Sequence, residues 1–190
     1  MKTTEDVREK ILTTAGRLFY KLGYNATGIN QIIEDAGVAR ASLYYHFKSK
    51  NDLLHAYLES QHEEWFSALE AYVGKKKTAK EAILAIFDYR MGRQVALDFG
   101  GCPFIKAGME SEIQDSVTHD IVNRNKDNLR LFLIGLVKRL DKRPSFMSVE
   151  MLTDTLFLLL EGASAAGSYQ RRKDAHIHAK KIAMNLLTQK

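Results

Sequence analysis

The side chains best suited to chemistry in this sequence lie in residues 36–54, AGVARASLYYHFKSKNDLL. A short helix is predicted directly after Gly37, and the spacing of Val38, Leu43 and Phe47 predicts that these three residues face the protein core. The other residues of this helix then point outward: Arg40, Ala41, Ser42, Tyr44, Tyr45 and His46. An α-helix fits the major groove of DNA, where such side chains can reach base edges and phosphates. A solvated amphipathic helix without a partner is the simpler alternative.

The elements around this helix predict how it is held. Apolar residues at helical spacing predict a first helix over about residues 4–22, with Thr3 and Asp6 as its capping box. A short second helix follows, with Thr27 as its predicted N-cap, and Gly37 ends it. Two short helices joined by a tight turn with glycine, and braced by a longer helix, describe a helix-turn-helix.

Helical patterns continue to the end of the chain. Ser49 and Asp52 have the spacing of a second capping box, which would open a long fourth helix. The lysine-rich residues 74–80 are the clearest linker. Further helices are predicted at about 79–97, one or two between 103 and 122, and at 123–141, 149–170 and 174–188. We therefore expect an all-α protein of about nine helices.

Composition narrows the class of protein. The chain has 190 residues, of which 45% are hydrophobic, so it is long and apolar enough to bury a core. Its net charge of +5 permits an acidic partner such as nucleic acid. Its one cysteine, Cys102, excludes an intramolecular disulfide and a multi-cysteine zinc site. His176 and His178 are spaced wrongly for one helix face, and we expect no metal and no cofactor.

The longest apolar run, 156–167, is broken by Glu161 and is too short for a membrane span. With no visible secretory signal, we expect a cytoplasmic protein that does not bind membranes.

Residues 8–54, REKILTTAGRLFYKLGYNATGINQIIEDAGVARASLYYHFKSKNDLL, closely resemble the DNA-binding domain of the tetracycline-repressor (TetR) family of transcriptional regulators. The match covers about a quarter of the chain and includes the Gly-Val turn, the LYYHF core and the KSK that follows. It implies a helix-turn-helix domain at residues 1–49 and a ligand-binding and dimerisation domain at residues 50–190.

The resemblance also implies roles for single residues. It places Tyr44, His46 and Lys50 against phosphates, and Arg40, Ala41, Ser42 and Tyr45 nearest base edges. Asn30 stands where the family often has a base-reading arginine, and Asn can pair with adenine. The amide of Thr27 can approach a phosphate at a helix terminus. Gly28 replaces the usual hydroxyl-bearing residue, which removes one expected phosphate contact.

The C-terminal part predicts a partner. The helices at about 123–141 and 149–170 have apolar residues on more than one side, which is more than a helix packed on a single neighbour needs. This favours a homodimer interface, and a monomeric core is the alternative. A dimer presents two recognition helices to palindromic half-sites about 34 Å apart on the double-stranded DNA operator.

A small-molecule site is also expected in the C-terminal part, because such sites are apolar cavities with few polar groups. The candidate ligand contacts are His62, Phe66, Phe87, Arg90, Gln94, Cys102, Met109 and Tyr169, although each aromatic or methionine side chain among them could simply be core. The resulting prediction is a ligand-responsive regulator, by resemblance a repressor, released from its operator by a small molecule.

Cys102 leaves alternatives open. It precedes a predicted helix start, where it could react with electrophiles or oxidants and act as a sensor, or it could fill a tight corner. A small helical enzyme with Cys102 as nucleophile is a remote alternative, which needs His119, His176 or His178 as its base. An architectural DNA-binding protein without an effector is a third.

Overall fold

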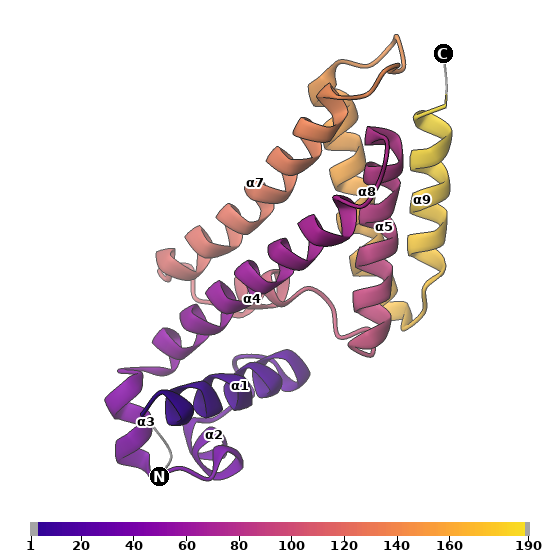
Figure 1. Ribbon diagram of the computed structural model, residues 1–190. Helices are drawn as coiled ribbons and strands as arrows, with labels where there is room; N and C mark the ends of the chain where they lie inside the picture. The colour runs from indigo at the N-terminus through magenta and orange to yellow at the C-terminus, as the bar shows by residue number, and fades with distance from the viewer. Residues whose placement is uncertain (1–3, 189–190) are drawn as a thin grey trace. The chain divides into compact units, whose positions relative to one another are not determined.

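The computed structural model describes residues 4–188, and these form helices and connecting turns without a β-strand. The order of the nine helices is shown in Figure 1, and their bounds are α1 Thr4–Leu22, α2 Ile29–Ala36, α3 Arg40–His46, α4 Lys50–Val73, α5 Ala79–Ala96, α6 Pro103–Glu110, α7 Ser116–Lys138, α8 Val149–Gln170 and α9 Asp174–Leu186. The all-α prediction is confirmed.

The described residues fall into two compact units. The first unit holds residues 4–64 and 103–123, and the second holds 65–102 and 124–188. This division differs from the domain boundary predicted after residue 49. The start of α4 packs into the first unit through Leu53, Leu54 and Leu58, which are almost fully buried. The functional domain boundary stays a prediction.

Helices α1, α2 and α3 enclose a small apolar core in the first unit. Its centre is formed by Ile11, Ala15, Ile32, Ala36 and Leu43, each of which has no exposed surface. Fully burying a side chain such as leucine or isoleucine is worth about 1.5–3 kcal/mol, so this core fixes the orientation of α3.

Local sequence signals explain where the helices begin. Ser49 opens α4 as predicted, because its Oγ accepts a hydrogen bond from the amide of Asp52 at 3.0 Å. Thr78 and Glu81 form a reciprocal capping box at the start of α5. The predicted capping residue Thr3 lies outside the described residues.

The prediction that a long helix begins near residue 123 was wrong, since α7 begins at Ser116. The carboxylate of Asp115 accepts hydrogen bonds from the amide of Thr118 at 3.0 Å and from its hydroxyl at 2.7 Å. Asp115 therefore caps a first turn that the apolar periodicity alone does not reveal.

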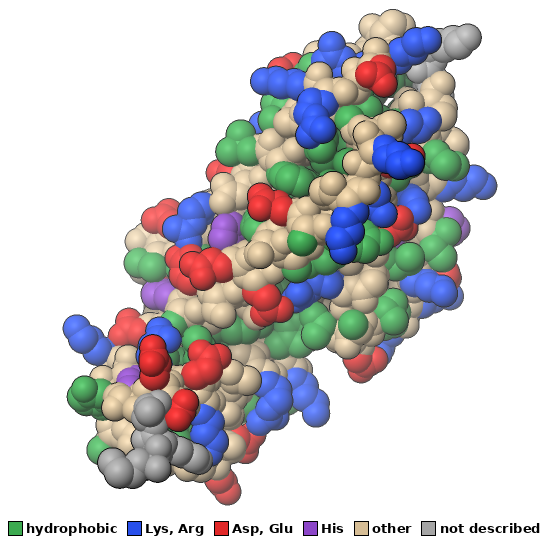
Figure 2. Space-filling view, viewed as in Figure 1, with side chains coloured by type: hydrophobic (Ala, Val, Ile, Leu, Met, Phe, Trp, Pro, Cys, Tyr) green, Lys and Arg blue, Asp and Glu red, His purple; other side chains and the backbone are tan. Residues whose placement is uncertain are grey.

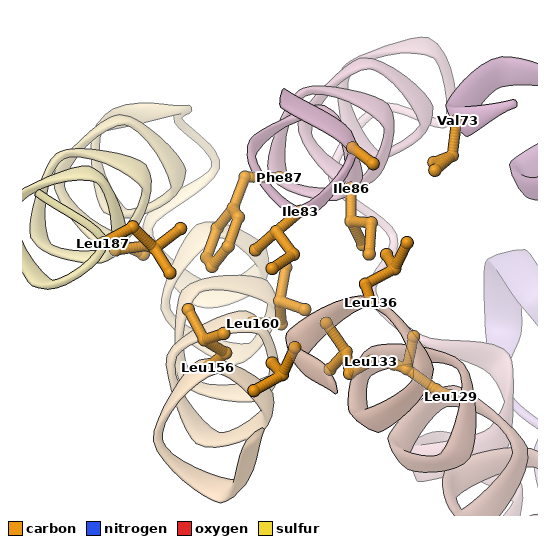
Figure 3. Packing of buried hydrophobic residues seen from close by; sticks show 14 of the residues in the cluster. Val73, Ile83, Ile86, Phe87, Leu129, Leu133, Leu136, Leu156, Leu160 and Leu187 are labelled. Atoms are coloured by element: carbon orange, nitrogen blue, oxygen red, sulfur yellow. The ribbon is translucent and has the colours of Figure 1, made fainter. Parts of the chain in front are cut away.

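The second unit is built around an apolar cluster contributed by the end of α4 and by α5, α7, α8 and α9. Figure 3 shows Ile83 and Phe87 of α5 directed toward Leu156 and Leu160 of α8, with Leu133 of α7 beside them. Within residues 4–188, every helix is too short or too polar to cross a membrane.

Candidate nucleic-acid interface

The turn between α2 and α3 has the geometry of a helix-turn-helix. Gly37 ends α2 in the left-handed conformation, with φ 55° and ψ 48°, which glycine adopts at little cost. Its amide donates to the carbonyl of Glu34 at 2.9 Å, and the next amide, of Val38, donates to Ile33 at 3.2 Å. These bonds close the end of α2 and set the direction in which α3 leaves.

Helix α3 buries one side and exposes the other, as the sequence predicted. Leu43 and Phe47 are 0% and 4% exposed, whereas Tyr45 is 77% exposed and Tyr44 is 44% exposed. The other outward residues divide into exposed Arg40 and Ala41 and half-buried Ser42 and His46. The hydrogen-bonding groups of α3 are thus available to a partner.

Arg40 and Asn30 are brought together across the turn. The Nη2 of Arg40 donates a hydrogen bond to the Oδ1 of Asn30, and both residues are exposed. Two side chains that the resemblance places near bases therefore form one polar unit, one from α2 and one from α3.

The start of α1 adds a basic group beside α3. Arg8 of α1 lies over the ring of Phe47, with its Cζ 5.2 Å from the ring centroid. Thr4, Glu5, Arg8, Tyr45 and His46 line an open hollow. Sequence reasoning missed Arg8, because the amphipathic pattern of α1 identifies only its buried residues.

Lys50, predicted to contact a phosphate, lies at the start of α4. Its Nζ is 4.1 Å from the centroid of the Tyr24 ring. Burial lowers the pKa of Lys50, an effect that the negative charge of Glu110 opposes. Burial also raises the pKa of Tyr24, with further contributions from Asp115 and Glu112.

The expectation for Thr27 needs correction. The N-cap of α2 is Gly28, which has no side chain to cap the helix. The Thr27 side chain is fully buried, its hydroxyl donates to the carbonyl of Gly23 at 2.7 Å, and its amide donates to Tyr24 at 3.2 Å. Thr27 therefore stabilises the turn between α1 and α2, and both of its polar hydrogens are used inside the protein.

Helix α6, although distant in sequence, belongs to the same unit and holds this turn. Oε2 of Glu110 accepts from the amide of Asn25 at 2.9 Å, and the Glu110 carbonyl accepts from Asn25 Nδ2 at 3.0 Å. Nζ of Lys106 donates to the carbonyl of Tyr20 at 2.6 Å. Two residues of α6 therefore hold this region: Lys106 binds the end of α1, and Glu110 binds the loop before α2.

A second connection joins the starts of α4 and α7. His55 of α4 shares a hydrogen bond of 3.1 Å with the Thr118 hydroxyl, and its Nε2 lies 3.6 Å from Asp115. The pKa of Asp115 is lowered: burial acts in the opposite direction, and the hydrogen bonds from Thr118 and the charge of His55 outweigh it.

Basic and acidic side chains are mixed over the face shown in Figure 2. The excess of +5 is therefore not collected on that face.

The second unit contains a polar network among the residues predicted to contact a ligand. Arg90 of α5 donates to the carboxylate of Glu161 at 3.0 Å and to the hydroxyl of Ser164 at 2.7 Å, both on α8. Lys126 of α7 donates to the same carboxylate at 2.6 Å, and its Nζ lies 3.5 Å from the Sγ of Cys102. Arg90 and Cys102 are thus linked through Glu161 and Lys126, which the sequence did not single out as ligand contacts.

Gln94 and His176 extend the polar interior of this unit. Gln94 Nε2 donates to the Ser164 carbonyl and to the Ser168 hydroxyl, each at 2.8 Å, and its Oε1 pairs with Nε2 of His176. Burial lowers the pKa of His176 to about 4, and the charge of Arg90 acts in the same direction.

The other predicted ligand contacts are scattered. Phe87 is 1% exposed in the apolar core, whereas Met109 and Tyr169 are 83% and 76% exposed. His62 stacks edge-on against Phe104, and Phe66 lies against Trp65. Their roles toward a ligand stay predictions.

Two further observations concern the chemistry available. No cluster of three or more His, Cys, Asp or Glu side chains suited to a metal ion occurs among residues 4–188. The neighbour of the Cys102 thiol is a lysine, and the Nε2 of His176, a candidate base, is bonded to Gln94. The pairing of thiol and imidazole that the enzyme hypothesis requires is therefore not seen within the described part of the chain.

Taken with its turn and its exposed α3, the first unit defines a helix-turn-helix protein. Residues 11–57 match the model of the family described as "Bacterial regulatory proteins, tetR family". The whole chain resembles the crystal structure of a TetR transcriptional regulator from Chloroflexus aurantiacus, with a TM-score of 0.88, 24% identity and coverage of 100% of this chain and 98% of that one. Residues 11–57 therefore match the DNA-binding part of TetR-family regulators, and the likeness of the whole chain to the solved structure shows a shared fold.

Curated relatives are similar mainly in the first unit. HTH-type transcriptional regulator LmrA of Bacillus subtilis is 53% identical over 49 residues, which are 26% of each chain. HTH-type transcriptional regulator QacR of Staphylococcus aureus is 36% identical over 76 residues, which are 40% of each chain. The alignments with these relatives thus cover less than half of their length, and leave most of the second unit without a match.

Proposed function

We propose that this protein is a ligand-responsive transcriptional repressor, which acts in the cytoplasm and binds a palindromic operator as a homodimer. The exposed side of α3, the second helix of the helix-turn-helix, supports the proposal most directly. This helix buries Leu43 and Phe47 and leaves Arg40, Tyr44 and Tyr45 exposed. A helix presented in this way fits the major groove of DNA.

The residues of this surface divide into two groups. Arg40 and Asn30 form one exposed polar unit, which suits them to reading base edges together, and Ala41, Ser42 and Tyr45 complete the base-facing set. Tyr44, His46 and Lys50 are proposed to lie against phosphates, joined by Arg8. Thr27 is left out because its polar groups are used within the turn.

An outward stripe on α8 supports the proposed homodimer. Its residues follow one another at intervals of three and four positions: Met151, Thr155, Leu158, Gly162, Ala165 and Tyr169. Leu158 is 66% exposed and Met151 is 55% exposed, and Leu131 on α7 is 60% exposed. Apolar side chains exposed at helical spacing, with small residues between them, suit the close approach of a second copy of the same helices.

The proposed switch depends on α6. A ligand in the second unit that favours one position of residues 102 and 103 would alter the hold of α6 on Asn25 and Tyr20, and so the presentation of α3. A coupling of about 1–3 kcal/mol corresponds to a 5- to 150-fold change in operator affinity.

The test is binding of the full chain to its own upstream intergenic DNA and to random DNA across a salt series. Tight binding to the upstream fragment alone, with a steep salt dependence, is expected for a dimeric operator-reading protein. Equal, weak binding to both DNAs would contradict the proposal. Specific binding that no small molecule releases would favour an architectural protein.

A second candidate, thiol-based sensing, is favoured by one contact. The Nζ of Lys126 lies 3.5 Å from the Sγ of Cys102, and this free cysteine is only partly buried, so a reagent in solution can reach it. If Cys102 is the sensor, Cys102→Ser abolishes release of DNA by electrophiles or oxidants. Full release by the variant excludes this candidate.

A further inference from the structure

Two mostly buried cations in the second unit share one carboxylate. Arg90 Nη2 lies 3.0 Å from Glu161 Oε1, and Lys126 Nζ lies 2.6 Å from Glu161 Oε2. The side chains of Arg90, Lys126 and Glu161 are only 10%, 18% and 16% exposed. Within residues 4–188, Glu161 is the only carboxylate in ion-pair contact with either cation. This cluster of three residues, the Arg90–Glu161–Lys126 cluster, therefore has one positive charge in excess.

The positive charge in excess is not altered by the protonation states of Glu161 and His176. Burial acts to raise the pKa of Glu161, but Arg90 and Lys126 together hold it below its ordinary value, so the carboxylate stays ionised. His176, whose pKa is about 4, stays neutral near pH 7 and contributes no charge. A charge that is largely removed from water is costly without a counter-charge.

The cluster also has hydrogen-bond donors to spare. Arg90 Nε and Nη2 both donate to the Ser164 hydroxyl, but Nη1 donates to none of the described residues. Nη1 is not sealed inside the protein, because the only fully enclosed side-chain nitrogen or oxygen without a partner in residues 4–188 is Nδ1 of His176. The planar guanidinium can present such free N–H groups to a carboxylate.

Aromatic rings lie next to these donors. The Cζ of Arg90 is 5.8 Å from the centroid of the Trp65 ring, and that ring contacts Phe66 at 4.8 Å and Tyr89 at 5.8 Å between centroids. All three rings are only partly buried. A ligand whose charged end meets Arg90 and Lys126 could therefore place an apolar body against this aromatic group.

We propose that the Arg90–Glu161–Lys126 cluster binds a small organic carboxylate with an apolar or aromatic body, and that this carboxylate supplies the missing negative charge. The inference rests on the proposed function, because it names the chemical class of the effector that the second unit binds. Arg90 and Lys126 are its binding residues, and Glu161 positions both of them.

The experiment compares carboxylates with their neutral amides. Benzoate, 1-naphthoate and octanoate, each beside its primary amide, are titrated into the full chain by calorimetry. We expect at least one carboxylate to bind roughly ten-fold or more tightly than its amide, as for a hydrogen bond to a charged group. No preference for any carboxylate over its amide overturns the proposal.

Variants with opposite expected effects separate binding from damage to the fold. Lys126→Met removes one cation and should abolish the preference for carboxylate, whereas Glu161→Gln removes the internal competitor and should strengthen carboxylate binding. Lys180→Met is the matched control, since Lys180 pairs with Asp88 at 2.7 Å elsewhere in the unit and should leave the preference unchanged. Weaker carboxylate binding by Glu161→Gln overturns the proposal.

Two other outcomes are also decisive. Carboxylate binding that appears only in Cys102→Ser means that the Cys102 side chain closes the site in the unaltered protein, and overturns the proposal. The operator assay without ligand tests the DNA-reading function separately: specific DNA binding without carboxylate preference rejects this inference alone, and carboxylate preference without specific DNA binding rejects the proposed regulator alone.

Discussion

Glu110, in the last turn of α6, accepts a hydrogen bond from the backbone amide of Asn25 at 2.9 Å, across 85 positions of sequence. The same residue's carbonyl accepts from the Asn25 side chain at 3.0 Å. The loop that joins α1 to α2 is therefore fixed by a helix that follows the whole of α5 in the sequence.

Glu110→Ala should lower the stability of the first unit by about 1–2 kcal/mol, because the amide of Asn25 loses its acceptor. It should also weaken the effect of a ligand on DNA binding, because the contact is part of the proposed coupling. Urea unfolding and operator titration with and without ligand measure the two effects. Ile113→Ala, which changes a side chain that is 91% exposed just after the same helix, is the control and should change neither.

Gly23→Ala should also destabilise the protein near Glu110, because of the backbone conformation at residue 23. Gly23 has a φ of 94°, and a Cβ added there would lie 2.7 Å from Oε1 of Glu110. A cost of about 1–3 kcal/mol is expected from the backbone conformation alone. Gly108→Ala in α6 adds a Cβ at an ordinary 3.6 Å from Val122 and serves as the control in thermal unfolding. Equal melting temperatures for the two variants would contradict the expectation.

Arg40→Ala should cost about 1–3 kcal/mol in operator binding and relax specificity at one base pair. Lys50→Ala, in contrast, should weaken binding to all sequences alike and flatten the salt dependence. Binding curves on the operator, on single-base operator variants and on random DNA distinguish the two. If both variants lose the same amount on operator and random DNA, the division between base and phosphate contacts is wrong.

Leu158→Asp should convert the protein to a monomer, because it places a charge in the middle of the apolar stripe on α8. Loss of the second reading helix should then lower operator affinity by roughly 100-fold or more. Sedimentation at micromolar concentration gives the first result and DNA titration the second. Ile113→Asp alters a residue that is 91% exposed in the first unit, and should leave both unchanged.

Acid should destabilise the second unit through His176. Its folded-state pKa is about 4, against an ordinary value of 6.5, so between these values the unfolded chain takes up a proton that the folded chain does not. Stability from this residue is complete above pH 6.5 and should fall by roughly 2 kcal/mol by pH 5. Urea unfolding at pH 7.5 and pH 5 should show a smaller difference for His176→Gln. His178→Gln, at an exposed position of the same helix, should keep the full difference.

The sequence predicted the first unit well because its signals are local. Gly37, Leu43 and Phe47 specify the turn and the buried side of α3 within eleven residues, and periodicity is sufficient to interpret them. Thr27 was misassigned for an equally local reason. Its hydroxyl has two possible backbone partners, and burial of the side chain favours the carbonyl of Gly23 over the start of α2.

The second unit could not be predicted to the same depth. Arg90 and Glu161 are 71 positions apart, and Lys126 and Glu161 are 35 positions apart, so their pairing depends on how three helices pack. One signal was available, the single charged residue Glu161 within the apolar run of α8. A charge in such a run needs a partner, but the sequence does not say which cation provides it.

Cys102 is the last residue of the second unit before Pro103, which begins α6 and returns the chain to the first. One peptide bond therefore joins the neighbour of Lys126 to the helix that holds Asn25. At such a junction, an insertion would displace Glu110 from Asn25, whereas a substitution in the second unit would not. In the proposed regulator, side chains around the Arg90–Glu161–Lys126 cluster can change, and the effector with them, while the number of residues between position 102 and Glu110 has to be kept.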